Sequence, residues 1–310
     1  MNETQPKISI VIPTFNMARF LPECLSTIAK QDYPNLEVII IDGASTDDTQ
    51  AVIEQSGYIV SRVVSERDNG QADAVSKGLK LATGDIVHWH AADDIVLPGA
   101  FYRVVAEFKK HPELDLIFSD GLGFTSSVIT KGPIVRWVNF LDSVLFFCRF
   151  QSDCAYWRRA ITYDVLPLDN NKQITCDEDF FLRMWVGHKY RWISQPLGAF
   201  RIHGDQVSQR LDRSTIETER EGTRRLIFEQ LGWSETHVKV MRKKRAFSYW
   251  LWNRFAVKAY SGVRFALRKL TGDILRRRYS RFIFEEWIRP VSQKTELNKP
   301  TTDYFEFLNL

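Results

Sequence analysis

The chain has 310 residues, of which 44% are hydrophobic and 26% are charged. This balance excludes intrinsic disorder, which combines low hydrophobicity with high net charge, and the ordinary Gly and Pro contents exclude a collagen-like or low-complexity protein. We find no apolar run of the roughly 18 residues that a membrane-spanning helix needs, and we expect no secretory signal. The four cysteines lack CxxC spacing, so we expect reduced thiols in a cytoplasmic protein rather than a zinc site or a disulfide framework.

The first 120 residues alternate predicted strands and helices. Short apolar runs bounded by turn residues predict buried strands at 8–13, 36–42, 59–65, 86–90 and 114–118. Apolar residues at helical spacing and capping residues predict helices at 20–28, 45–53, 73–81 and 98–108. This alternation is typical of an α/β protein with a parallel sheet of the nucleotide-binding type.

The rest of the chain has a different pattern. Residues 121–175 lose the alternation and are aromatic, after which we expect a helix at 177–187 and a strand at 190–200. From about Asp212 the chain is predicted to be helical.

The net charge of +4 is divided unevenly, with −5 over residues 1–210 and +9 over residues 211–310. We therefore expect a catalytic domain at 1–210, with metal or polar chemistry, and a basic, aromatic helical extension at 211–310 that meets an anionic partner.

Polar residues follow four consecutive predicted strands, where open α/β sheets bind their ligands. These strand ends are Pro13–Asn16, Asp42–Asp47, Glu66–Asp73 and Ala91–Asp94. Neither GxGxxG nor GxxxxGK[ST] follows any strand, which disfavours a dinucleotide site and a P-loop. The Asp93–Asp94 pair instead suits a hard divalent cation that bridges phosphate oxygens.

These segments resemble a known family. "SIVIPTFNMARFLPECLSTIAKQDYPNLEVIIIDGASTDDT" and "SERDNGQADAVSKGLKLATGDIVHWHAADDIVLPGA" are similar to the family 2 glycosyltransferases, and the resemblance extends over roughly residues 7–205. It implies a GT-A fold, a Rossmann-like, mostly parallel sheet flanked by helices. It also implies a nucleotide-diphospho-sugar donor of UDP type, Mg²⁺ or Mn²⁺ as cofactor, and inverting transfer.

The resemblance implies roles for residues at the strand ends. Asp42 would accept the imide N–H of a uracil-like base, and Asp93 would face the ribose. Asp94 would hold the metal on the diphosphate, with Ala92 standing where many relatives carry an acid. The residues implied around the nucleotide and its sugar are Pro13, Thr14, Asn16, Asp42, Asp68, Gln71, Asp73 and Asp93.

Three later segments complete the implied site. "CDEDFFLR" matches the acidic helix start of the family and makes Asp177 the general base, with Asp179 as second choice. "FRIHGDQVS" places His203 near the metal or the diphosphate. "QSDCAYWR" falls where relatives form the acceptor pocket, and we expect Gln151, Tyr156 and Trp157 to contact the acceptor.

The basic extension leaves two interpretations open. Residues 241–290 carry 14 Lys and Arg against 3 acids, interleaved with aromatic residues, which suits a helix at an anionic membrane surface. The alternative is a helical subdomain packed on the catalytic core or forming a homodimer. No nucleic-acid-binding motif is present, and we expect no nucleic acid.

We therefore predict an inverting hexosyltransferase of bacterial-type surface polysaccharide or glycan synthesis, acting on a saccharide or lipid-linked hydroxyl. It would be cytoplasmic and peripheral on the membrane. A nucleotidyltransferase, or an inactive nucleotide-sugar-binding partner at a membrane surface, remains the alternative.

Overall fold

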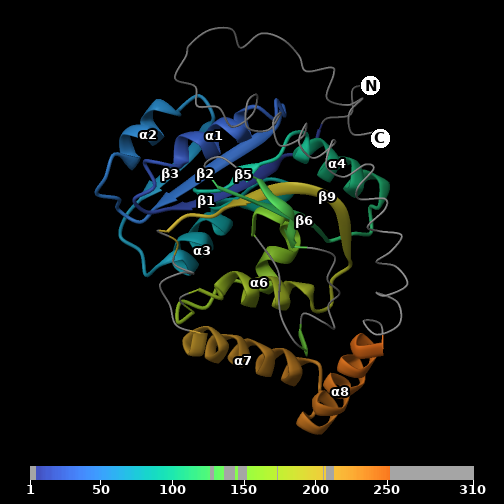
Figure 1. The fold of residues 1–310 in the computed structure, drawn as a ribbon. Helices are drawn as coiled ribbons and strands as arrows, with labels where there is room; N and C mark the ends of the chain where they lie inside the picture. The colour runs from blue at the N-terminus through green and yellow to red at the C-terminus, as the bar shows by residue number, and fades with distance from the viewer. Residues whose placement is uncertain are drawn as a thin grey trace.

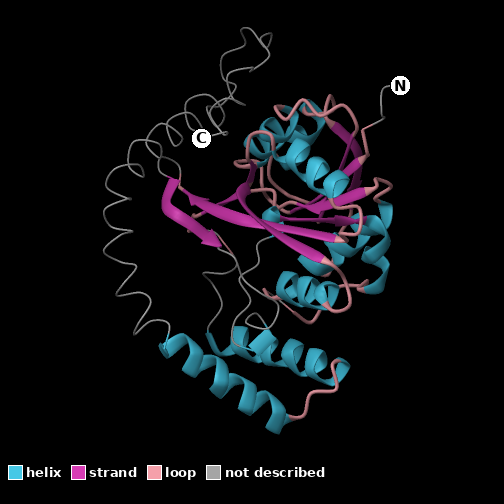
Figure 2. Ribbon diagram, turned by 90° about the vertical axis from the view of Figure 1, so that its right-hand side faces the viewer, coloured by secondary structure: helices cyan, strands magenta, loops and turns pink. Residues whose placement is uncertain are grey.

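The computed structural model describes residues 5–125, 129–135, 144–145, 152–172, 174–204, 206 and 213–251. Its described part is built around one mixed β-sheet with helices on both faces (Figures 1 and 2). The α/β class and the GT-A-type layering expected from the sequence are confirmed.

The strands of the sheet lie in the order β3-β2-β1-β4-β8-β6-β9-β5, and β7 pairs with β6. Their bounds are β1 Ile8–Thr14, β2 Leu36–Asp42, β3 Val60–Ser65, β4 Ile86–Trp89, β5 Ile95–Val96, β6 Leu116–Phe124, β7 Ile129–Val135, β8 Ala155–Arg158 and β9 Tyr190–Arg201. Strands β1 to β4 are mutually parallel, whereas β8 is antiparallel to both β4 and β6. The sheet is therefore parallel in its N-terminal half and mixed beyond it.

The α-helices follow the predicted alternation and then leave it. They are α1 Leu21–Ala29, α2 Thr49–Gln55, α3 Gln71–Leu81, α4 Ala100–Lys110, α6 Cys176–Trp185, α7 Arg213–Gln230 and α8 Glu235–Leu251. Two short 3-10 helices flank β8, η1 at Ser152–Cys154 and η2 at Arg159–Asp164. The helices α7 and α8 lie beyond α6, at the end of the molecule opposite α1 and α2 (Figure 1).

Each face of the sheet has its own hydrophobic core. Successive strand side chains point to opposite faces, so Val11 joins the cluster against α3 and α6, while Ile10 and Ile12 join the cluster against α1 and α4. Burial on both faces explains why these strands read as continuous apolar runs.

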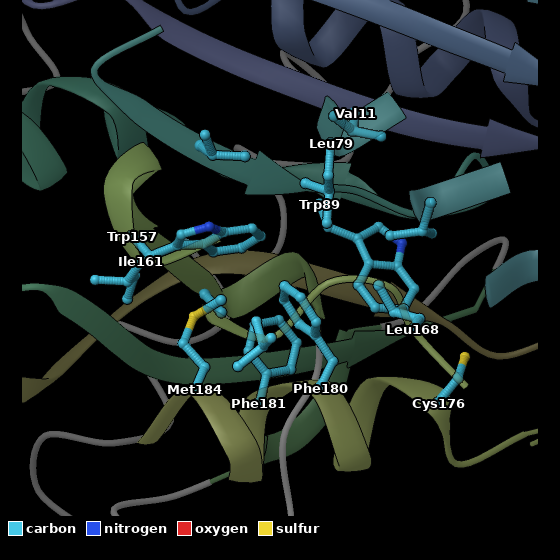
Figure 3. Close-up of a cluster of buried hydrophobic side chains, with 14 of the residues drawn as sticks. Val11, Leu79, Trp89, Trp157, Ile161, Leu168, Cys176, Phe180, Phe181 and Met184 are labelled. Carbon is cyan, nitrogen blue, oxygen red and sulfur yellow. The ribbon is translucent and has the colours of Figure 1, made fainter. Parts of the chain in front are cut away.

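The core under α6 is aromatic. Trp89, Trp157, Phe180 and Phe181 pack together there in edge and stacked contacts (Figure 3). Helix α3 reaches the sheet closely because Gly78 has no side chain; a Cβ there would lie 2.3 Å from Cγ1 of Val11.

The aromatic segment is where the sequence-based prediction was wrong. We expected the fifth strand to end at 118, but β6 continues to Phe124, and β8 lies inside the segment without predicted structure. Gly121 and Gly123 interrupt the apolar pattern of β6, and pairing with β9 keeps them in the sheet. A strand that depends on distant partners leaves a weak local signal.

The division at 210 remains a prediction. Helix α7 begins at Arg213, and its Ile227 belongs to the same buried cluster as α6. In the described residues, no helix combines the length and apolarity that crossing a bilayer requires. Cys24, Cys154 and Cys176 are free and buried, and Cys148 lies outside the described residues.

Candidate functional site

The first three strands end together at one edge of the sheet. Thr14 at the end of β1 lies beside Asp42 at the end of β2, and Asp42 lies beside Ser65 at the end of β3. Parallel neighbours with matched register bring their carboxyl-end residues together, so the sequence-predicted strand ends do meet.

Asp42 is fully buried, and its carboxylate is already bonded within the chain. It accepts hydrogen bonds from the Ser65 hydroxyl at 2.7 Å, from the Ser45 backbone N–H at 3.1 Å and from the Gln50 side-chain amide. The carboxylate has no exposed surface in this structure, and its predicted contact with the nucleobase imide stays a prediction. Asp42 holds the loop that follows β2.

The loop after β1 presents different groups from those expected. Pro13 and Thr14 are buried, whereas Phe15 is 55% exposed. Asn16 has a left-handed backbone (φ 53°), and its side-chain carbonyl accepts the Thr46 N–H at 2.8 Å. Asn16 therefore ties the two loops together, and Phe15 is the exposed aromatic face at this edge. Sequence analysis missed Phe15, although its position after a strand-end Pro-Thr was a usable signal.

Asp68 lies over the same edge. A Cβ added to Gly43 would meet its Oδ2 at 2.8 Å, so the two loops touch there because residue 43 has no side chain. Asp68 Oδ1 accepts the Gly70 N–H at 2.9 Å.

The start of α3 contains both a bonded and an exposed polar group. Asp73 accepts the Asn69 N–H at 3.1 Å and pairs with Lys77 at 3.3 Å, and these bonds lower the pKa of its carboxyl. Gln71 is exposed, and its side-chain oxygen lies 3.8 Å from the Cys176 thiol, which joins the heads of α3 and α6. Gln71 is thus better placed for a ligand than Asp73.

Asp93 and His203 meet at the end of the fourth strand. Asp93 Oδ2 lies 2.9 Å from Nε2 of His203, and both side chains are partly exposed. Arg201 holds the backbone of this pair, because its Nε donates to the Asp93 carbonyl at 2.7 Å. The same guanidinium forms an ion pair with Glu23. His203 therefore lies beside Asp93, and its predicted place at a metal or a diphosphate stays a prediction.

Asp94 is only 2% exposed, and its Oδ1 accepts the Arg201 backbone N–H at 2.8 Å. Burial raises the pKa of its carboxyl well above the usual range, with further contributions from the charges of Asp93 and Asp153. Asp94 thus anchors the end of β9, and its assignment as a metal ligand stays a prediction.

Asp153, on η1, is an acid that sequence analysis did not single out. It is 1% exposed, and its Oδ1 is buried without a hydrogen-bond partner in the described part of the chain. Burial raises its pKa to about 7, and the nearby charge of Asp93 contributes. The available signal was an isolated acid in an otherwise apolar and aromatic segment.

The donors at this edge fit a divalent cation that shares its coordination with a substrate. Across the described residues, no group of three or more His, Cys, Asp or Glu side chains forms a metal centre. The Asp93 carboxylate and the His203 imidazole are nevertheless partly exposed and converge at 2.9 Å. One or two protein ligands completed by phosphate oxygens and water is the usual arrangement for Mg²⁺.

The first turn of α6 carries three acids in different states. Glu178 pairs with Arg220, whose Nε lies 2.8 Å from it. Asp179 is 2% exposed, and its oxygens accept from Arg183 at 2.8 Å and Thr223 at 3.0 Å. The second-choice assignment of Asp179 as general base stays a prediction, and its buried, bonded carboxylate disfavours it. Asp177 is partly exposed and accepts the Glu178 backbone N–H at 2.7 Å.

The surroundings of Asp177 change its acidity. Loss of hydration raises the pKa of the Asp177 carboxyl to about 7, and the neighbouring Glu178 charge adds to the rise. A carboxylate with a pKa near neutrality can both accept and release a proton at physiological pH. Among the sequence-predicted residues, Asp177 best fits a general base.

The predicted acceptor residues are not at a surface. Tyr156 is fully buried and stacks on His88 at 4.0 Å, and Trp157 is fully buried with its Nε1 donating to Thr162. Both are core residues in this structure, because β8 is an interior strand covered on both faces, which disfavours the acceptor assignment that the sequence predicts. Gln151 lies outside the described residues.

The model of one protein family, described as "Glycosyl transferase family 2", matches residues 9–127. A PGL/p-HBAD biosynthesis glycosyltransferase of Mycobacterium tuberculosis is 32% identical over 184 residues, which cover 57% of this chain and 69% of that protein.

Solved structures share the fold. S. aureus TarS superposes with a TM-score of 0.55 at 20% identity; the match covers 63% of this chain and 37% of the TarS chain. A mannosyltransferase from Pyrobaculum calidifontis, solved with GDP-Man and Mn²⁺, gives a TM-score of 0.51 at 15% identity over 87% of this chain and 88% of that one.

Proposed function

This chain belongs to the family 2 glycosyltransferases, and on that premise we propose that it moves a sugar from a UDP-type nucleotide-diphospho-sugar to an acceptor hydroxyl, with inversion at the anomeric carbon. Support for the donor class comes from S. aureus TarS, which has been solved with UDP and with UDP-GlcNAc. Support for the acceptor class, a saccharide or lipid-linked hydroxyl of a surface glycan, comes from the mycobacterial relative of PGL/p-HBAD biosynthesis.

Asp177 is the observation that carries the proposal. Of the three acids in the first turn of α6, Glu178 is in an ion pair and Asp179 is buried, whereas the Asp177 carboxylate is partly exposed with a pKa raised to about 7. Inverting transfer needs one base within reach of the acceptor hydroxyl.

The reaction then follows from this one base. The acceptor oxygen forms a bond to the anomeric carbon, its proton passes to Asp177, and the bond from that carbon to the nucleoside diphosphate breaks on the opposite face. Asp93 and His203 would hold Mg²⁺ or Mn²⁺, which would supply positive charge to stabilise the leaving diphosphate.

The nucleotide would lie over the ends of β1 to β3. Phe15 offers an exposed aromatic face for the base, and Asp68 and Gln71 lie beside it on the following loop and helix. Asp42, Asn16 and Asp73 act indirectly in this proposal, because each one shapes a loop through bonds within the chain.

The test uses the purified full chain. A thermal-shift screen of UDP, UDP-sugars and GDP-mannose, each with and without Mn²⁺, identifies the donor; a ligand at about 100 times its dissociation constant stabilises by roughly 2.7 kcal/mol. Slow hydrolysis of the stabilising sugar nucleotide supports the transferase. Binding without hydrolysis or transfer would favour the inactive-partner alternative, and pyrophosphate exchange with a nucleoside triphosphate would favour a nucleotidyltransferase.

We also propose that the basic extension brings this enzyme to the cytoplasmic face of a membrane. Helix α8 exposes Lys239, Lys243 and Lys244 together with the apolar Val240 and Phe247. Each basic residue near an anionic surface contributes about 1 kcal/mol. Most of the basic 241–290 segment lies outside the described residues.

Sedimentation separates the two interpretations of the extension. Salt-sensitive binding to anionic but not to neutral liposomes supports attachment at a membrane. Equal, negligible binding to both, with a dimer in solution, would support a homodimer through the C-terminal helices.

A further inference from the structure

The head of α6 is capped by another helix. Its own N-cap residue, Thr175, makes no side-chain capping bond. Instead the Glu219 carboxylate, from α7, accepts the Thr175 backbone N–H at 3.1 Å and its hydroxyl at 2.9 Å. The same oxygen accepts the Ile174 N–H at 3.4 Å. Glu219 therefore holds the two residues that lead into α6, whereas the Glu178 N–H within the first turn is accepted by the Asp177 carboxylate.

The neighbouring residues of α7 hold the two other acids of this turn. Arg220 binds the Glu178 carboxylate through two nitrogens, and the Thr223 hydroxyl donates to Asp179 at 3.0 Å. Glu219, Arg220 and Thr223 lie on one face of α7, which packs against α6, and Ile227 continues that face into the core.

This face of α7 lies far from the family segment in sequence, since the family model matches residues 9–127 and α7 begins at Arg213. The base-bearing turn of α6 also lies outside the matched segment. Figure 1 shows α6 between the sheet and α7. The part of the chain that carries the base is thus held from both sides.

We propose that α7 is the positioning element of the general base, with Glu219 fixing the first turn of α6 and Arg220 drawing Glu178 away so that Asp177 faces the acceptor. This inference rests on the proposed function, in which Asp177 is the base. Glu219 and Arg220 touch neither substrate nor metal in this proposal and act through α6.

Among the described residues, three charged or titratable groups contribute to the environment of Asp177. Glu178 and Cys176 neighbour it on α6, and Arg220 faces it from α7. Glu178 favours protonation of Asp177, whereas Arg220 favours its carboxylate form. Removing the Arg220 charge therefore leaves Glu178 unpaired and makes Asp177 harder to deprotonate.

The principal variant is Arg220→Met, studied in the full chain. We expect its kcat at pH 7 to fall by roughly 10- to 100-fold, the size of loss that a small misplacement of a reacting group causes. Donor affinity should be unchanged. The acidic limb of the pH–rate profile should move upward by about 0.5–1 unit, somewhat less than a fully adjacent charge gives. Arg220→Lys keeps the positive charge. Its kcat and its acidic limb should therefore lie much closer to those of the parent than the values of Arg220→Met do.

Two control variants lie on the same helix. Arg225 is 83% exposed and pairs with Glu229, so Arg225→Met should leave kcat and the pH profile unchanged. Ile227→Ala removes buried volume, so it should lower Tm without moving the acidic limb. Glu219→Ala should lower kcat, and Glu219→Gln, which keeps an acceptor oxygen, should lower it less.

The outcomes separate the two proposals. If Arg220→Met and Ile227→Ala lose activity only in proportion to Tm, with the same pH profile as the parent, α7 is merely a structural support and the inference is overturned. If the parent protein binds and turns over no sugar nucleotide, the proposed function fails instead. In that case the carboxyl-carbon NMR titration of Asp177 still compares parent, Arg220→Met and Arg225→Met, and an identical titration in all three would reject the positioning role.

Discussion

His203 Nε2 lies 2.9 Å from Oδ2 of Asp93, although 110 residues separate them in sequence. The contact forms because β9 ends beside the turn that follows β4, where Arg201 donates to Asp94 and to the Asp93 carbonyl. One partly exposed carboxylate and one imidazole thus lie next to a buried, bonded carboxylate. The two neighbouring acids look equivalent in the sequence, but Asp94 is buried whereas Asp93 is partly exposed.

Asp93→Ala should abolish metal-dependent donor binding and leave Tm nearly unchanged, because its side chain is partly exposed. Asp94→Ala should do the opposite. It leaves the buried Arg201 N–H without its acceptor, which costs about 1–3 kcal/mol. Mn²⁺ titrations of donor binding, paired with melting curves, compare the two variants. If Asp94→Ala loses the metal dependence of donor binding while its melting curve is unchanged, Asp94 rather than Asp93 is the metal ligand.

Asp177→Asn should keep donor affinity and lose transfer by roughly 10²–10⁴-fold, the usual contribution of a general base. The amide preserves the shape of the side chain and removes its basicity. Because Asp177 has a pKa of about 7, kcat/KM of the parent should fall as the pH drops below 7. Asp179→Asn serves as the stability control, since it breaks a buried network. Near-normal turnover of Asp177→Asn would remove Asp177 from the reaction.

The same residue should cost the protein stability at high pH. In the unfolded chain an Asp titrates near 3.9, and in the fold Asp177 titrates near 7, so folding takes up a proton between these values. The penalty is absent below about pH 4 and complete above about pH 7. Asp177→Asn should therefore raise Tm at pH 8, with the gain disappearing toward pH 4. A gain of the same size at both pH values would contradict the raised pKa.

Glu37 should stabilise the fold away from the site. Its carboxylate accepts from Ser9, Thr83 and Lys7, and these hydrogen bonds, acting against the effect of burial, lower its pKa to about 2. The stabilisation is present above pH 4.5 and is lost as the pH falls through 2. Glu37→Gln should cost about 2–3 kcal/mol at pH 7. Urea unfolding at pH 7 and at pH 3 measures the loss of unfolding free energy in Glu37→Gln. An equal loss at both pH values would show that the hydrogen-bond geometry of this side chain, and not its charge, stabilises the fold.

Tyr156→Phe distinguishes a core residue from an acceptor residue. The Tyr156 hydroxyl is buried without a hydrogen-bond partner in the described residues, so removing it should leave Tm unchanged or raise it. The KM for the acceptor should not move. A several-fold rise in acceptor KM with an unchanged melting curve would place Tyr156 back in the acceptor pocket.

Local pattern was sufficient for the first half of the fold. β1 and β2 are continuous apolar runs that end at turn residues, and their burial on both faces of a parallel sheet requires that composition. The strand β8 had no such signal. Its place in the sheet depends on β4, about 70 residues earlier, and on β6, about 40 residues earlier. Its Tyr156 and Trp157 therefore looked like a binding surface and are in fact core.

The sequence alone determined which acids stand at strand ends and at the head of α6, since motif and spacing are local properties of the chain. The tertiary structure decided which of them are buried and bonded within the chain and which reach solvent. Packing of β9 against the turn after β4 buries Asp94 and exposes Asp93 beside His203. Packing of α7 against α6 bonds Glu178 to Arg220 and Asp179 to Thr223. The Asp177 carboxylate remains partly exposed. Solvent access and hydrogen-bond partners set the chemistry of a carboxylate, and both depend on residues that are distant in sequence.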